Sequence, residues 1–166
     1  MSKRELKNYV KELTKVQLQE QILDLYDRFK DVKQYYNFAF NPKEDKLLEE
    51  CKFKISKEYF PVNMRKPKMR RSVAQKYIRN FKTLGVEPTI IADVMLYNIE
   101  IAQAFCSNKR VKQDSFYTSM LKSFEEAVAY IYDNALTKTL QQRIDKIVDE
   151  TIDQNWFNHK GFEIAN

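Results

Sequence analysis

Apolar residues recur every three or four positions along most of the chain, which is the spacing of one face of an α-helix. The longest such run lies between residues 14 and 36, where the spacing alternates between four and three. This run, called the heptad seam below, consists of Leu18, Ile22, Leu25, Phe29, Val32 and Tyr36. The spacing is compatible with a coiled-coil edge, but inside a small domain it is more typical of packing within the chain. We therefore expect one long helix that packs intramolecularly.

Capping residues mark where helices begin and end. Ser2 precedes Glu5 by three positions, and Thr14 precedes Gln17 by three. This is the spacing of a capping box, in which two side chains each satisfy a free backbone N–H of the first turn. Gly85 is suited to end a helix in the left-handed conformation. About seven helices are expected, beginning near residues 2, 14, 42, 69, 88, 114 and 137.

The composition favours an all-α fold. Only two glycines and four prolines occur among 166 residues, whereas sandwiches and barrels need many tight turns. We expect one domain, residues 1–166, with a weak sub-boundary at the basic linker 61–68. The expected helices form antiparallel hairpins, whose lengths resemble HEAT-type units that stack into a right-handed helical array. Trp156 and Phe157 are expected to cover an end of the core, and residues from His159 onward are expected to be frayed.

Four short segments provide caps and core positions for the first helices. They are Ser2-Lys3-Arg4-Glu5-Leu6, Leu13-Thr14, Ile22-Leu23-Asp24-Leu25-Tyr26 and Asn41-Pro42-Lys43-Glu44-Asp45. Together they are similar to an uncharacterised bacterial family of small all-helical proteins, a domain of unknown function. The resemblance extends over most of the chain and implies a helical fold. It implies no activity, because the family has no assigned catalytic residues.

The positive charge of the chain is concentrated in one stretch. Residues 59–86 contain no Asp or Glu, and the formal net charge of the whole chain is +6. The eight cations of this stretch are the candidate binding residues: Arg65, Lys66, Lys68, Arg70, Arg71, Lys76, Arg79 and Lys82. We expect those on the helix near residues 69–84 to occupy its exposed face, opposite Val73, Tyr77, Phe81 and Leu84.

This basic face favours a non-enzymatic binding or scaffold protein. Its cations would neutralise the phosphates of a polyanion such as a nucleic acid, without sequence preference. Arg70 and Arg71 would be suited to bidentate phosphate contacts. Two other interpretations stay open: the cations are simply solvated, or they pair with the acidic stripe of Asp145, Asp149 and Asp153 in the same molecule.

Patterns typical of cofactor or metal chemistry are absent from the sequence. Phosphate-cradling loops need several glycines, and the chain has one histidine, His159, and no Cys-x-x-Cys motif. We therefore expect no catalytic residue, no cofactor and no metal site. Cys51 and Cys106 lie in apolar helical settings and are expected to be free, structural thiols.

Two alternative functions remain. Asp93 and Glu100 are seven positions apart on one helix face, so an enzyme of unknown type could use carboxylates in a helical groove. We expect these two groups to be solvated or ion-paired instead. A protein–protein interaction module is the other alternative. The longest apolar run, residues 89–97, is short and interrupted by Asp93, so we expect a cytoplasmic protein without membrane contact.

Overall fold

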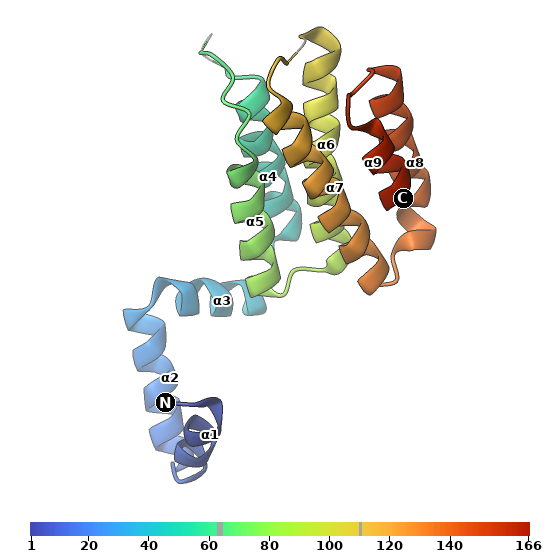
Figure 1. Cartoon of the computed structure of the whole chain (residues 1–166). Helices are drawn as coiled ribbons and strands as arrows, with labels where there is room; N and C mark the ends of the chain where they lie inside the picture. Colours follow the sequence, from blue (N-terminus) through green and yellow to red (C-terminus); the bar gives the residue numbers. More distant parts are fainter. Residues whose placement is uncertain (63–64, 110) are drawn as a thin grey trace. The chain divides into compact units, whose positions relative to one another are not determined.

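The computed structural model describes residues 1–62, 65–109 and 111–166, and within them it contains nine α-helices and no strand (Figure 1). The all-helical fold expected from the sequence is confirmed. The helices are α1 (Lys3–Lys11), α2 (Lys15–Arg28), α3 (Lys30–Phe40), α4 (Glu44–Tyr59), α5 (Arg71–Leu84), α6 (Pro88–Asn108), α7 (Asp114–Asp133), α8 (Thr137–Asp153) and α9 (His159–Ala165).

The chain divides into two compact units. Unit 1 is Met1–Lys43 and contains α1, α2 and α3, and unit 2 is Glu44–Asn166 and contains α4 to α9. The linker at 61–68 lies inside unit 2, between α4 and α5, and its residues 63 and 64 are outside the described residues.

Both capping boxes of unit 1 form as predicted. The backbone N–H of Ser2 donates to the Glu5 carboxylate at 2.6 Å, and the N–H of Glu5 donates to the Ser2 hydroxyl at 3.3 Å. Thr14 and Gln17 make the same reciprocal pair at 2.9 and 3.3 Å. Each pair satisfies donors that the first turn of a helix leaves free.

The single long helix expected over the heptad seam is wrong. Phe29 has φ −115° and ψ 118°, an extended conformation that separates α2 from α3. Aromatic residues lose rotamer freedom in a helix, and the break brings Tyr26 against α3. Its hydroxyl donates to Asn37 at 3.0 Å, and its ring centroid lies 6.4 Å from that of Tyr36.

Helix α6 forms the centre of unit 2. Successive helices from α4 to α9 run in opposite directions (Figure 1), and α6 contacts α4, α5, α7 and α8. Its buried residues therefore cover a broad arc of the helix rather than one narrow stripe: Ile91, Ala92, Val94, Met95, Leu96, Asn98, Ile99, Ala102, Gln103 and Phe105. Among the described helices, only α6 is long and apolar enough to cross a membrane, and 56% of its most apolar window is buried inside the protein.

The fraying expected from His159 onward is also wrong. These residues form α9, and Phe162 is fully buried. The ring centroid of Phe162 lies 4.9 Å from that of Phe124 and 5.7 Å from that of Trp156. A Cβ at Gly161 would lie 2.5 Å from Leu121, so the glycine allows α9 to approach α7 closely. Trp156 is buried as expected, whereas Phe157 is exposed.

The packing of α9 makes a direct prediction. Phe162→Ala should lower the free energy of unfolding by about 3–5 kcal/mol, because it removes a fully buried ring and leaves a cavity. Ile164→Ala is the matched control, since this side chain is on the same helix but 86% exposed. It should change the stability by less than about 0.5 kcal/mol. Urea denaturation of both variants is the measurement, and equal effects would contradict the docking of α9.

Candidate anion-binding pocket

Glu58 anchors the basic linker to the end of α4. Its carboxylate accepts two hydrogen bonds from the guanidinium of Arg70, at 2.8 and 2.7 Å. Its backbone carbonyl accepts from the N–H groups of Lys68 and Met69, at 2.9 and 3.0 Å. Met69 has φ 51°, the left-handed turn that lets the chain fold back in this way. Hydrogen bonds from Arg70 hold the pKa of the Glu58 carboxyl below its usual value, against the opposing effect of partial burial.

The folded-back linker and the end of α4 enclose a pocket of about 200 Å³. Five cations line it, and we call them the basic pocket: Lys57, Arg65, Lys66, Lys68 and Arg70. Pro61 and Val62 supply its apolar wall, and Glu58 is the only acid among its described lining residues. Arg70 already pairs with Glu58, and the other four cations of the pocket form no ion pair with the described residues. The pocket therefore has an excess of positive charge.

The eight cations predicted from the sequence fall into different settings. Arg65, Lys66, Lys68 and Arg70 come together at the basic pocket. On α5, Lys76 and Arg79 are exposed, and Lys82 is exposed with its ammonium 4.4 Å from the ring centroid of Tyr130. Arg71 is the exception, as described next.

The expectation that Arg71 lies on the exposed face is wrong. The buried face of α5 is formed by Ala74, Ile78, Phe81 and Leu84, which is rotated from the predicted stripe. This rotation turns Arg71 toward α7, where it donates to Ser123 and Glu126, each at 2.7 Å. Gln75 donates to the same carboxylate at 2.8 Å. Arg71 therefore stabilises the contact between two helices of unit 2.

The acidic stripe of α8 does not pair with the basic residues within the described part of the chain. The ion pairs of Arg70 and Arg71 go to Glu58 and Glu126. Asp145 instead accepts hydrogen bonds from Gln141 at 2.9 Å and from Asn166 at 3.1 Å.

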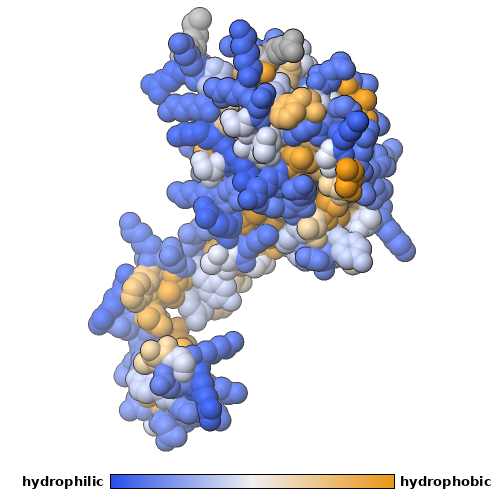
Figure 2. All heavy atoms as spheres, viewed as in Figure 1, coloured by the Kyte–Doolittle hydropathy of each residue, from blue (hydrophilic) through white to orange (hydrophobic). Residues whose placement is uncertain are grey.

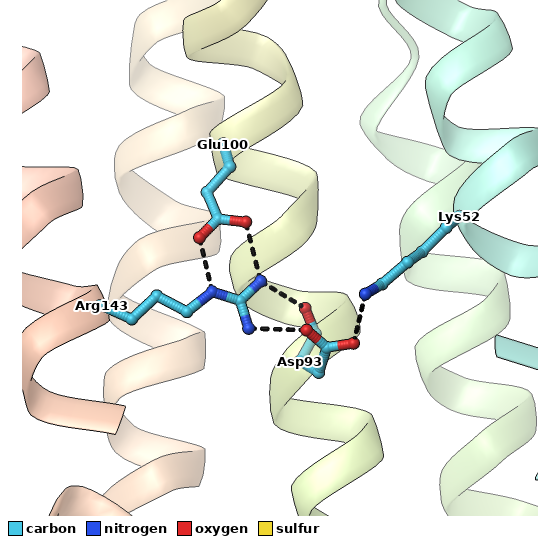
Figure 3. A network of polar contacts seen from close by, with 4 residues as sticks. All are labelled: Lys52, Asp93, Glu100 and Arg143. Atoms are coloured by element: carbon cyan, nitrogen blue, oxygen red, sulfur yellow. Dashed lines mark hydrogen bonds and ion pairs between the residues drawn. The ribbon is translucent and has the colours of Figure 1, made fainter. Parts of the chain in front are cut away.

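Asp93 and Glu100 belong to an ion-pair network that joins three helices (Figure 3). The guanidinium of Arg143 on α8 reaches α6 and donates to Glu100 at 2.5 and 2.7 Å and to the Asp93 carboxylate at 2.6 Å. Lys52 on α4 approaches the other oxygen of Asp93 at 2.6 Å. Burial alone would lower the pKa of Arg143, but the hydrogen bonds that it donates to Glu100 and Asp93 outweigh burial and raise the pKa. Both carboxylates are thus ion-paired, as expected.

A second cleft, of about 740 Å³, lies where α6 and α8 end and α7 begins. Its lining includes Cys106, Gln154, Trp156 and Phe157. Two of its polar side chains bond to the protein: Gln154 donates to Ser107 at 2.8 Å, and the Trp156 indole N–H donates to Gln154 at 2.9 Å.

Neither cysteine has the properties of a reactive thiol. Both are free, Cys51 is buried and Cys106 is half-buried. Burial raises the pKa of Cys51 to about 12 and that of Cys106 to about 11, so both stay protonated at neutral pH. Over the residues that the structure describes, no cluster of three or more His, Cys, Asp or Glu side chains could hold a metal ion.

One known protein family matches the chain over its whole length. Residues 1–166 match the family of unknown function DUF6155. The chain belongs to DUF6155. The resemblance to a family of helical proteins of unknown function is thereby confirmed. No curated protein and no solved structure matches the DUF6155 chain. The candidate site in this DUF6155 protein therefore stands on its own geometry.

Lys57 is the member of the basic pocket that the DUF6155 sequence did not reveal. It lies just outside the acid-free stretch, next to Glu58. The negative charge of Glu58 therefore cancels the positive charge of Lys57 in the local net charge. The hydrogen bonds between Glu58 and Arg70 span twelve positions, and no local pattern announces them.

The ion-pair network of this DUF6155 protein should contribute strongly to stability. Arg143→Met would leave Asp93 paired with Lys52 alone and Glu100 without an ion pair among the described residues. It should lower the free energy of unfolding by about 2–3 kcal/mol. Arg28→Met is the control, because Arg28 pairs with Asp24 on an exposed helix face, with 70% of its side chain in water. That change should cost less than about 0.5 kcal/mol. Denaturation curves would contradict us if the two variants lost equal stability.

The Glu58–Arg70 pair should make stability depend on pH in a specific direction. The folded-state pKa of Glu58 is lowered, so its contribution is complete above the unfolded-state pKa of about 4.3 and is lost as pH falls through the folded value. The difference in free energy of unfolding between wild type and Glu58→Gln should therefore be constant at neutral pH and should shrink as the pH becomes acidic. The difference between wild type and Arg70→Gln should shrink in the same way. Urea denaturation from pH 3 to 7 is the measurement, and a difference that persists in acid would contradict the pair.

Proposed function

We propose that this chain is a non-enzymatic, helical binding protein that takes an anionic partner at the basic pocket. The observation that supports this most directly is the convergence of five cations around one small cavity whose only described acid is already held by Arg70. Like charges gathered without counter-charges repel one another, and an anion that enters the cavity relieves that repulsion.

The proposed partner is a polyanion such as a nucleic acid, recognised through its phosphates. A cavity of about 200 Å³ suits a phosphate group better than a base and its sugar. Lys76 and Arg79 on the exposed side of α5 add charge that a short anion would not use. Contacts of this kind give affinity without reading sequence.

The proposed scaffold is a HEAT-like stack of three hairpins, α4/α5, α6/α7 and α8/α9. It is supported by the contacts of α6 with both α4 and α8, and by those of α7 with α9. We place the protein in the cytoplasm without membrane contact, because α6 uses its apolar surface in the core of unit 2. The enzyme alternative has less support, since Arg143 holds both Asp93 and Glu100.

Binding should weaken steeply as salt rises. Each neutralised phosphate releases about 0.7–0.9 of a counterion, so four contacts give a log–log slope of about −3 to −4. The triple variant Arg65→Gln, Lys66→Gln and Lys68→Gln should flatten this slope by about 2–3 on the same principle. Arg70 and Arg71 are left intact, because their ion pairs stabilise the fold. Fluorescence anisotropy with a labelled single-stranded oligonucleotide over a salt series is the measurement.

A charge-matched control separates a site from general attraction. Lys138→Gln, Lys146→Gln and Lys160→Gln remove the same charge from exposed positions on α8 and α9 and should leave most of the slope unchanged. Equal effects of the two triple variants would reduce the basic pocket to non-specific attraction. Undetectable binding of the wild type at low salt would remove the proposal.

A further inference from the structure

Unit 1 has no core of its own. None of the residues of α1, α2 or α3 is buried. Within the heptad seam, Ile22 is 36%, Leu25 is 44% and Phe29 is 54% exposed. Figure 2 shows apolar atoms, in orange, at the surface of this unit. The intramolecular packing expected for the heptad seam is only partial within unit 1, where Leu18, Val32 and Tyr36 are half-buried.

Such an arrangement needs an apolar partner to persist in water. The three helices are 9, 14 and 11 residues long, and isolated helices shorter than about 12–15 residues are marginal in water. A 43-residue unit is close to the size, about 40 residues, below which a fold generally needs a disulfide, a metal or oligomerisation. Unit 1 contains no cysteine and no histidine, so among these oligomerisation remains.

The spacing of the heptad seam identifies the shape of the partner. Positions that alternate by four and three pack best against a helix with the same alternation, each side chain entering a hole between four others. Ile22, Phe29 and Tyr36 occupy one seam position, and Leu18, Leu25 and Val32 the other. A second copy of the chain presents an identical seam, which makes the surface complementary to itself.

The acidic residues of α2 and α3 are placed to leave this surface free. Glu20, Asp24, Asp27 and Asp31 all fall on the two heptad positions farthest from the seam. The positions beside the seam hold uncharged residues such as Gln19, Gln21, Tyr26 and Tyr35, with Arg28 and Lys33 the only charges. Pairing would therefore bury no carboxylate, which is the costly event at such an interface.

Pairing along the whole heptad seam requires the break at Phe29 to close. The Phe29 N–H still donates to the Leu25 carbonyl at 3.0 Å, and the Phe29 carbonyl still accepts from the Lys33 N–H at 3.0 Å. Helical hydrogen bonds thus reach this residue from both sides, although its own backbone angles are extended. Closing the break would align the two halves of the heptad seam and would separate Tyr26 from Asn37 and Tyr36, so the paired seam must outweigh those contacts.

We propose that the heptad seam of unit 1 pairs with the heptad seam of a second copy, so that the chain forms a homodimer through Met1–Lys43. The basic pocket lies in unit 2 and takes no part, so this inference does not depend on the proposed function.

Sedimentation of the full-length chain over a concentration series tests the dimer. The wild type should sediment at twice the chain mass of 19.9 kDa. The double variant Ile22→Glu and Leu25→Glu should sediment as a monomer over the same range, with a dissociation constant at least tenfold higher, because it introduces charge into the seam. Fluorescence of Trp156, the only tryptophan and a buried residue of unit 2, verifies that unit 2 remains folded.

The matched control is Val16→Glu with Leu23→Glu. These side chains are also apolar and exposed on α2, at 61% and 63%, but both lie outside the heptad seam. This control should remain dimeric. A monomeric wild type overturns the proposal. If the seam variant of that monomer loses stability, the seam packs against unit 2. If the variant keeps its stability, the seam has another protein as its partner. A dimer that survives the seam variant, or that the control dissociates equally, also overturns it.

Discussion

The broad buried face of α6 is the constraint on which unit 2 depends. A helix whose apolar face is this wide requires neighbours in several directions. Helices α4, α5, α7 and α8 supply them. The same burial governs the charges, because Asp93 and Glu100 lie on this helix and need counter-charges from Lys52 and Arg143. The ion-pair network follows from the position of α6.

Local sequence signals predicted the parts of the fold that local physics controls. The capping boxes at Ser2 and Thr14 form, Gly85 adopts φ 73° at the end of α5, and Pro88 begins α6. The face of a helix on which a side chain lies was harder to predict from the sequence. Arg71 fits the periodic pattern of an exposed face, yet it contacts Glu126. Whether a helix buries one stripe or the next depends on its neighbours in space. The periodic pattern alone does not contain that information.

The candidate site was predictable in part for a related reason. An acid-free run of sequence locates four of the five cations of the basic pocket, because local charge density is visible along the chain. The fold-back that assembles them depends on Glu58, whose negative charge would have argued against a basic site at that position. A single well-placed acid thus organises a cationic pocket. The heptad seam shows the converse, since only part of its clear pattern is packed within unit 1.

The position of Phe162 has a consequence for how the chain folds during synthesis. This fully buried ring packs against Phe124 and Trp156, so the core of unit 2 is incomplete until residue 162 has left the ribosome. Domains generally fold as units while the chain emerges. By that point α4 to α8 have already been made, and the surface that α9 covers is open to water. Unit 2 is therefore most exposed to aggregation and to chaperones in the interval when α4 to α8 have emerged and α9 has not.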